Sequence, residues 1–328
     1  MMNLDSIDYK ILYELFLNSR QSSNAISKKT AINHSVVKYR ITKLEKTGII
    51  KNYCIAPDFQ KIGYHLYIFY INLQYASPGK EIEIISYLQK KKNTWRIETS
   101  QGKYNIILTI VVQNTEELLV FYKDMQNTYS NYFKKISLSQ SYELPEPKPM
   151  QQKKTIGKQP TKTTPPTELK DYEKKTLYKK ILSLLNKNAR IPTINIAQQL
   201  NISAPTAITY IKNLQEEGII KKYSVILDEE KIGLKRFFIR FTFADYKKID
   251  PIVQYLSTNS YIEEIYRVIG EYHLEVILHT HTLEHFHAIM QDIRNRYSND
   301  LKDYDYCIIN KIYMIPSESR IFDDEDDG

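Results

Sequence analysis

Basic, aromatic and hydroxyl side chains gather between residues 33 and 43, and these are side-chain types that proteins use to bind nucleic acid. Val37, Ile41 and Leu44 recur at i, i+4 and i+7, which predicts a helix that buries this face. The opposite face then presents cations to phosphates, and hydroxyl and imidazole groups to base edges. The predicted DNA contacts are Asn33, His34, Ser35, Lys38, Tyr39, Thr42 and Lys43.

A second stretch with the same apolar spacing lies 170 residues further along, and its polar face is weaker. It has a single cation, and Ile208 stands where the first stretch has Lys38. Its predicted DNA contacts are Ser203, Thr206, Thr209 and Lys212, and the predicted phosphate ligands in the strands that follow are Lys51, Lys221 and Lys222. We therefore expect an asymmetric reader, in which the first stretch binds DNA more tightly.

The two stretches belong to a long internal repeat. Residues 48–63 read GIIKNYCIAPDFQKIG and residues 218–233 read GIIKKYSVILDEEKIG, so nine of sixteen positions are identical. A period of about 170 residues predicts duplicated domains rather than a solenoid. Between the two copies, residues 145–167 hold six prolines and five lysines, which predicts a semi-extended linker.

Each copy predicts the same order of elements. Two short helices, a longer third helix and a β-hairpin form a winged helix-turn-helix, and the βαββαβ order that follows is that of a ferredoxin-like sandwich. The predicted fold class is therefore α+β, with two copies of this pair of domains. The predicted boundaries are 1–60 and 169–230 for the winged helices, 61–144 and 231–321 for the sandwiches, 145–168 for the linker, and 322–328 for an acidic tail.

Composition narrows the function classes. The formal net charge is +8, and it rises to +13 without the five acids of residues 323–327, which fits a polyanionic partner. Nine glycines argue against a Gly-rich nucleotide site, and two cysteines, Cys54 and Cys307, are too few for a disulfide framework. The sequence shows neither a signal peptide nor a membrane span, so we expect a cytoplasmic, nucleoid-associated protein without membrane contact.

The sequence from Ile32 to Ile50, followed by Tyr53, Asp58 and Ile62-Gly63, closely resembles the Lrp/AsnC (feast/famine) transcriptional regulators. Gly102-Lys-Tyr104 resembles the glycine turn of the family's sandwich domain. The resemblance implies binding to double-stranded DNA, oligomerisation through the sandwich sheets, and often an amino-acid effector. We therefore predict a sequence-specific regulator in which the two copies pair within one chain as a pseudo-dimer. No enzyme activity, cofactor or metal is expected, and assembly into a further homo-oligomer stays open.

Two departures from the family pattern bear on this prediction. The recognition helix of the first copy carries Arg40 and Glu45, which we expect to pair, and the second copy has Tyr210 and Gln215 there. The acid that usually follows the aromatic residue of the glycine turn is replaced by Asn105 in the first copy and by His273 in the second. This second departure argues against an effector of the family's type.

Three alternatives stay open. His279, His281, His285 and His287 could supply metal ligands, although residues 285 and 287 point about 200° apart on a helix. Siroheme decarboxylases resemble the same two-domain unit, so an enzyme of this fold is an alternative function. In a third alternative the second copy is only a dimerisation module.

Overall fold

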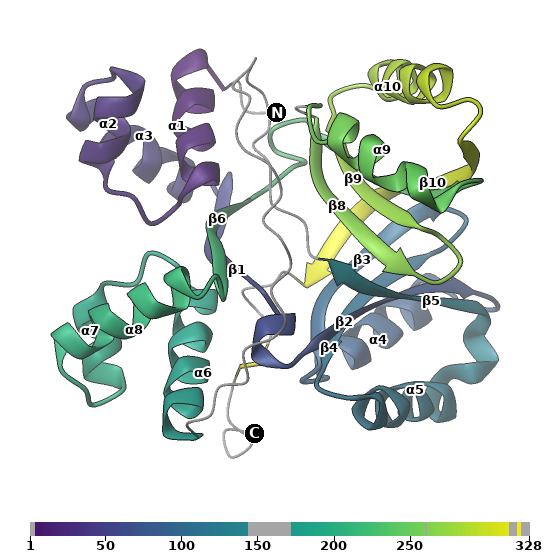
Figure 1. Ribbon diagram of the computed structural model, residues 1–328, viewed down its shortest axis with the longest axis horizontal. Coiled ribbons are helices and arrows are strands. Elements are labelled where there is room, and N and C mark those ends of the chain that lie inside the picture. The colour runs from purple at the N-terminus through teal and green to yellow at the C-terminus, as the bar shows by residue number, and fades with distance from the viewer. Residues whose placement is uncertain (1–3, 144–171, 260, 315–319, 323–328) are drawn as a thin grey trace. The chain divides into compact units, whose positions relative to one another are not determined.

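The computed structural model describes residues 4–143, 172–259, 261–314 and 320–322 (Figure 1). The predicted linker and the predicted acidic residues 323–328 lie outside these residues. The chain divides into two compact units. The winged-helix unit comprises Met1–Ile62, Pro149–Gly233 and Phe322–Gly328, and the barrel unit comprises Gly63–Lys148 and Leu234–Ile321. Each unit draws on both copies of the repeat.

The winged-helix unit contains two sets of three helices. These are α1 (Ser6–Leu17), α2 (Ser23–Thr30) and α3 (His34–Lys46) in the first copy, and α6 (Tyr172–Lys187), α7 (Thr193–Gln199) and α8 (Ala204–Glu216) in the second. The first copy begins its helices at the side chains of Asp5, Ser22 and Asn33, each of which accepts a hydrogen bond from the first turn. The predicted third helix is thereby confirmed.

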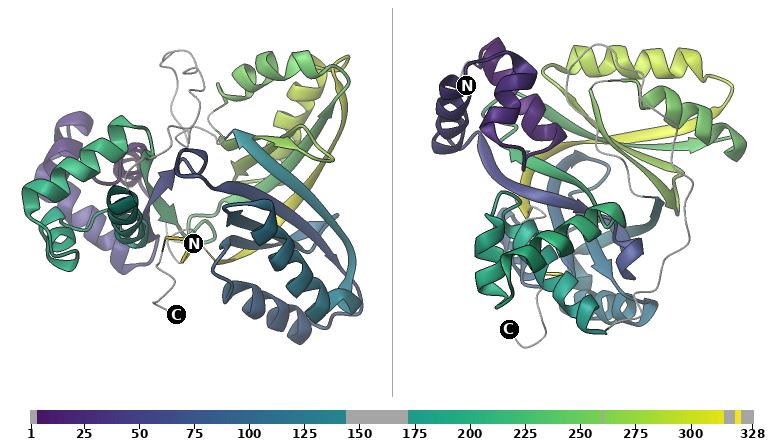
Figure 2. Two further views of the ribbon diagram at one scale, coloured as in Figure 1. Left: turned by 60° about the horizontal axis from the view of Figure 1, so that its bottom comes forward. Right: turned by 60° about the vertical axis from the view of Figure 1, so that its left-hand side comes forward.

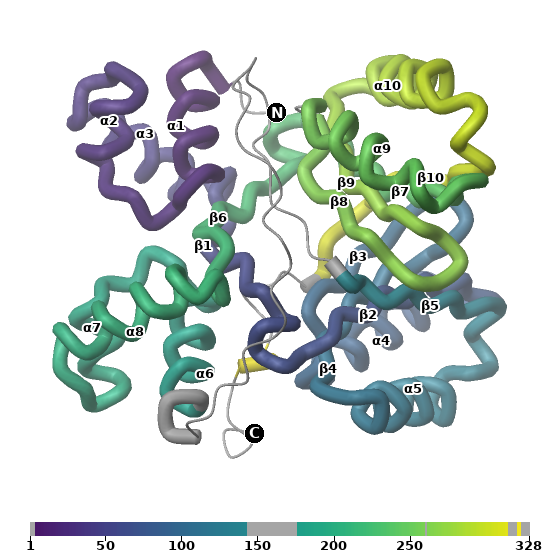
Figure 3. Tube along the Cα trace, viewed as in Figure 1, coloured from purple at the N-terminus to yellow at the C-terminus, as the bar shows by residue number. Residues whose placement is uncertain are grey.

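The predicted β-hairpin in each copy is wrong. Each copy contributes one strand, β1 (Ile50–Pro57) or β6 (Ile220–Leu227), and the two pair with each other antiparallel (Figure 3). Residues 58–63 leave too little chain for a returning strand, because a short 3₁₀ turn, η1 (Gln60–Ile62), fills them. Gly48 allows the turn from α3 into β1, since its φ of +67° is costly for residues with a Cβ. The wing is therefore a ribbon shared by the two copies.

Reciprocal hydrogen bonds reinforce this shared ribbon. Lys61 Nζ donates to the carbonyl of Glu217 at 2.7 Å, at the C-terminus of α8. Its counterpart Lys231 Nζ donates to the carbonyl of Thr47 at 2.9 Å, at the C-terminus of α3. Cations at these positions satisfy the free carbonyls at the end of a helix and interact favourably with its dipole. Each copy thus caps the third helix of the other.

A second reciprocal contact involves two arginines. Arg20 Nη1 donates to the carbonyls of Ala189 at 2.6 Å and of Ile191 at 2.9 Å. Arg190 Nη1 donates to the carbonyl of Ser19 at 2.9 Å. Each of the two guanidinium groups therefore donates hydrogen bonds to the backbone of the opposite copy.

The barrel unit is a closed eight-stranded barrel in the order β10-β3-β4-β2-β5-β8-β9-β7. The strands are β2 (His65–Leu73), β3 (Thr94–Gly102), β4 (Ile106–Val112), β5 (Phe133–Glu143), β7 (Lys235–Phe243), β8 (Ile262–Ile269), β9 (Leu274–Thr280) and β10 (Leu301–Met314). Within each copy the strands and helices follow the predicted βαββαβ order. Strands of different copies pair at two seams, β10 with β3 and β5 with β8.

Helices cover the outside of the barrel (Figure 2). They are α4 (Pro78–Gln89), α5 (Thr115–Tyr129), α9 (Ile249–Leu256) and α10 (Leu283–Arg296), with 3₁₀ turns η2 (Ser130–Tyr132) and η3 (Tyr246–Lys248). Alternate residues of each strand face these helices, so each copy has its own apolar core. In the second copy Phe237 of β7 stacks on Phe286 of α10, with ring centroids 4.0 Å apart. No helix in the described part of the chain is both long and apolar enough to span a bilayer.

The opposite strand faces line the inside of the barrel with charged and aromatic groups. Arg240 of β7 is fully buried, pairs with Asp305, and lies over the ring of Tyr104 with its guanidinium carbon 4.4 Å from the centroid. Glu275 of β9 is equally buried and accepts a hydrogen bond from the hydroxyl of Tyr70. Burial raises the pKa of Glu275 to about 7.

Candidate nucleic-acid interface

The predicted DNA face of α3 is exposed and chemically available. The backbone amide of Ser35 donates to Oδ1 of Asn33 at 2.9 Å, which fixes the start of the helix. Val37, Ile41 and Leu44 are buried, so the opposite side faces outward. Its members are His34, Ser35, Lys38, Tyr39 and Thr42, which are exposed, and Lys43, which is half-buried. Within the described residues, no hydrogen bond or ion pair engages the side chains of Lys38, Tyr39 or Lys43.

One further cation, Lys46, lies on this face in addition to the predicted residues. Lys46 is exposed at the end of α3, four residues after Thr42 and three after Lys43. Residues at these spacings share a helix face, so continuing the helical period would have found it in the sequence. With Lys46, α3 carries four cations and one carboxylate, which gives a formal charge of +3.

The expected pairing of Arg40 with Glu45 is wrong. Arg40 Nη1 instead lies 2.7 Å from Oδ2 of Asp5 and 3.1 Å from Oδ2 of Asp8, both at the start of α1. Glu45 accepts a hydrogen bond of 2.6 Å from the hydroxyl of Tyr53 on β1. Five residues along a helix turn through about 140°, so the two side chains leave on different faces. The hydrogen bond to Asp5 raises the pKa of Arg40 above its ordinary value.

The second copy replaces this ion pair with an aromatic pair. Tyr178 and Tyr210 occupy the positions of Asp8 and Arg40, and their rings meet edge to face with centroids 5.6 Å apart. The hydroxyl of Tyr178 donates to a carboxylate oxygen of Glu217 at 3.0 Å. The contact between first and third helix is therefore kept in both copies by different chemistry.

The polar side chains predicted to contact DNA on α8 have partners within their own helix. Ser203 accepts the backbone amide of Thr206 at 3.2 Å, and the two hydroxyl oxygens lie 2.7 Å apart. Thr209 donates to the carbonyl of Pro205 at 3.0 Å. Lys212 Nζ lies 3.4 Å from a carboxylate oxygen of Glu216, so the charges on α8 sum to zero. This helix offers DNA little free charge.

The three predicted phosphate ligands on the wing lie along the β1–β6 ribbon. Lys51 Nζ is 3.5 Å from Asp228, and Lys221 Nζ is 3.2 Å from Asp58. Lys222 Nζ lies over the ring of Phe16, 3.3 Å from its centroid. These cations contact groups of the protein, and the first two form reciprocal ion pairs between the copies.

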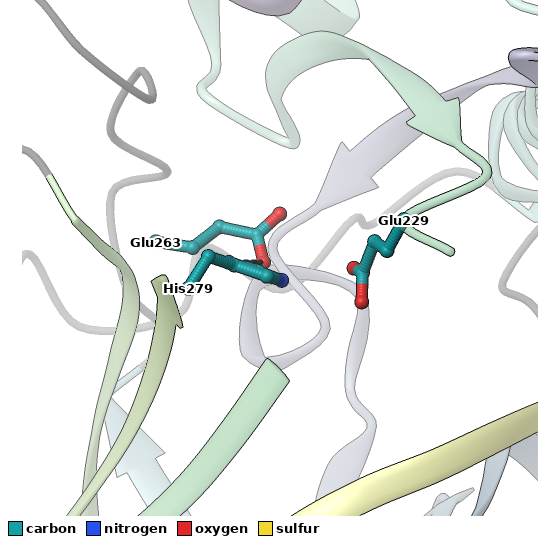
Figure 4. Close-up of side chains that lie close together, drawn as sticks. All are labelled: Glu229, Glu263 and His279. Carbon is teal, nitrogen blue, oxygen red and sulfur yellow. Dashed lines mark ion pairs between the residues drawn. The ribbon is translucent and has the colours of Figure 1, made fainter. Parts of the chain in front are cut away.

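The histidine-rich segment does not assemble as a metal site in the described part of the chain. His279 on β9 is buried, and its Nδ1 lies 3.6 Å from the carboxylate of Glu263 (Figure 4). Glu229, also labelled there, belongs to the winged-helix unit. His285 on α10 packs edge to face on Tyr261. No three of the four histidines come within ligand distance of one another among the described residues.

Both winged helices of this chain are similar in sequence to those of known DNA-binding proteins. The model of a family described as winged helix-turn-helix DNA-binding matches residues 4–51 and 179–221, once in each copy. The transcriptional regulator LrpB of Bacillus subtilis is 33% identical over 126 residues, which cover 38% of this chain and 78% of that regulator. The chain belongs to the Lrp/AsnC family of transcriptional regulators. The regulatory protein AsnC of Haemophilus influenzae is 29% identical over 116 residues, 35% of this chain and 77% of that protein.

A solved structure resembles the whole tandem arrangement. The siroheme decarboxylase NirDL matches over 96% of this chain and 97% of its own, with a TM-score of 0.61 and 14% identity. At this identity the likeness shows a shared fold. The two matches of the family model and the sequence relatives make this chain a tandem Lrp/AsnC protein and a DNA-binding regulator.

In this Lrp/AsnC chain, the residues that follow the aromatic residue of the glycine turn, Asn105 and His273, accept hydrogen bonds from backbone amides. Asn105 Oδ1 accepts the amide of Leu73 at 2.8 Å, and His273 Nδ1 accepts the amide of Phe243 at 3.1 Å. Burial lowers the pKa of His273, which favours the neutral ring that this acceptor role requires. Both side chains therefore hold the ends of strands β2 and β7.

Proposed function

We propose that the chain is a sequence-specific DNA-binding regulator that works as a single-chain pseudo-dimer, with α3 as its dominant reader. The observation that carries the proposal is the contrast between the two recognition helices. The outer face of α3 holds exposed cations, whereas α8 has no net charge and its lysine is paired. Free cations release counterions from DNA, and paired ones contribute less.

The shared ribbon and the two barrel seams support the pseudo-dimer. Because β1 pairs with β6, neither winged helix completes its wing without the other copy. A covalent link also replaces association of two chains by a high local concentration. One chain then presents two different helices to adjacent half-sites.

We propose that any amino-acid-like effector binds at a site that does not use the side chains of the turn residues Asn105 and His273. The hydrogen bonds of these two side chains to strand amides support that restriction. We propose no enzyme activity. The alternative, a siroheme-decarboxylase-like enzyme, has support at the level of the fold. Tetrapyrrole absorbance in the purified protein, combined with no DNA affinity at low salt, would favour that alternative.

Two double variants test the proposal. Lys38→Gln with Lys43→Gln removes two free cations from α3, and we expect DNA affinity to fall at least tenfold, with the slope of log affinity against log salt reduced by about 2. The matched variant, Thr206→Ala with Lys212→Gln on α8, is expected to lose less than about threefold, because Lys212 is already paired. Gel-shift titrations at several fixed salt concentrations measure both. Equal losses would contradict the asymmetry.

A further inference from the structure

An exposed apolar residue stands at the centre of the second recognition helix. Ile208 of α8 is 57% exposed, and it lies 170 residues after Lys38, at the same place in the helix. Ala204 precedes it by four residues and therefore lies on the same face one turn earlier. The buried side of α8 is made by Ala207, Ile211 and Leu214, so Ile208 is not part of the core.

The polar groups around Ile208 already have partners in or next to α8. The hydroxyl of Thr209 donates to Pro205, the hydroxyls of Ser203 and Thr206 contact each other, and Lys212 pairs with Glu216. Ile208 therefore gives the outward face of α8 an apolar surface, beside a lysine and a glutamate whose charges cancel. Such a surface gains free energy by removing apolar groups of a partner from water.

We propose that α8 is a thymine reader, in which Ile208, with Ala204 beside it, contacts the C5-methyl groups of thymines in the major groove. This inference rests on the proposed function. The C5-methyl of thymine is the apolar group that base pairs display in that groove, and small apolar side chains contact it. The winged-helix family model matches residues 179–221, which include Ile208, and the recognition helix of such a motif enters the major groove. The first half-site would be bound by charge and the second by methyl groups.

The test uses the full chain and removes the methyl groups from the DNA. Duplexes that bind are selected from a random library, and thymine is then replaced by uracil in one half-site at a time. For the unaltered chain we expect one half-site to lose about fourfold in affinity for each methyl group contacted. Ile208→Ala should lose most of the preference for the thymine duplex, because its methyl group reaches less far than the isoleucine side chain. Lys38→Ala, the matched change on α3, should lower affinity for both and keep their ratio.

The outcomes separate this inference from the proposed function. If Ile208→Ala keeps the full preference for thymine, or if uracil weakens binding in neither half-site, the thymine reader is overturned while DNA binding stands. If the chain selects no duplex at all, the proposed function fails with it. A second variant, Ile208→Lys, should strongly reduce the preference for thymine and make binding more salt-dependent, with the salt slope steeper by about 1. Retention of the full preference in Ile208→Lys would also overturn the inference.

Discussion

Replacing Arg40 with tyrosine is expected to destabilise the winged-helix unit by about 3 kcal/mol. The change leaves the carboxylate of Asp8 buried between α1 and α3 without its cation, while only the backbone amide of Asp5 still donates to it. An uncompensated buried charge costs more than the net contribution of the pair that it came from. Denaturant unfolding, followed by amide hydrogen exchange in α1 and α3, measures the loss.

The second copy provides the rescue for this variant. Adding Asp8→Tyr to Arg40→Tyr transplants the aromatic pair of Tyr178 and Tyr210 into the first copy, so we expect stability to return to within about 1 kcal/mol of the original. Lys38→Tyr, on the exposed face of the same helix, is the control and should change stability by less than about 0.5 kcal/mol. Failure of the double variant to recover would mean that the two contacts are not interchangeable.

Replacing Glu275 with glutamine is expected to remove a loss of unfolding free energy that grows with pH and reaches about 3 kcal/mol. Burial raises the pKa of Glu275 to about 7, so the folded chain holds a proton between about pH 4.5 and 7 that the unfolded chain has lost. Stability should therefore fall as the pH rises through this window, by up to about 3 kcal/mol, and stay level above it. Glutamine keeps the shape without ionising, so the variant should match the original chain near pH 5 and exceed it near pH 8.

The measurement for Glu275 is the difference in unfolding free energy between the two chains across that pH range. Subtraction removes the contributions of all other titrating groups that the variants share. Glu116→Gln, at an exposed site on α5, is the matched control, and its difference should change less with pH than that of Glu275→Gln. A flat difference for Glu275→Gln as well would show that the buried guanidinium of Arg240 holds the carboxylate charged throughout.

The local elements could be predicted from the sequence because their signals are local. The side chain of Asn33, the spacing of Val37, Ile41 and Leu44, and the turn at Gly48 together define α3. The order of the sandwich elements follows in the same way from strand alternation. Interactions between distant segments were not accessible, since one sequence does not say which strand pairs with β1 or which carboxylate meets Arg40.

The charged interior of the barrel could not be predicted from strand alternation. Alternation along β7 marks Phe237, Ile239 and Phe241 as core residues, and it would assign the residues between them to solvent. Closure of the barrel buries them instead, so Arg240 is fully enclosed. The clue available in the sequence was the position of this cation between aromatic residues on a strand. Its partner Asp305 lies more than sixty residues away, on β10.

The different contacts beneath the two recognition helices have a consequence for evolution. In a dimer of identical chains every substitution appears on both sides, so the bound DNA is kept palindromic by the symmetry of the protein. Here the ion pair of Asp8 and Arg40 and the ring pair of Tyr178 and Tyr210 occupy equivalent places in one polypeptide. The two halves therefore support their third helices by different contacts. For the proposed single-chain pseudo-dimer, the binding sites need not be palindromic, and a search for them should not impose inverted symmetry.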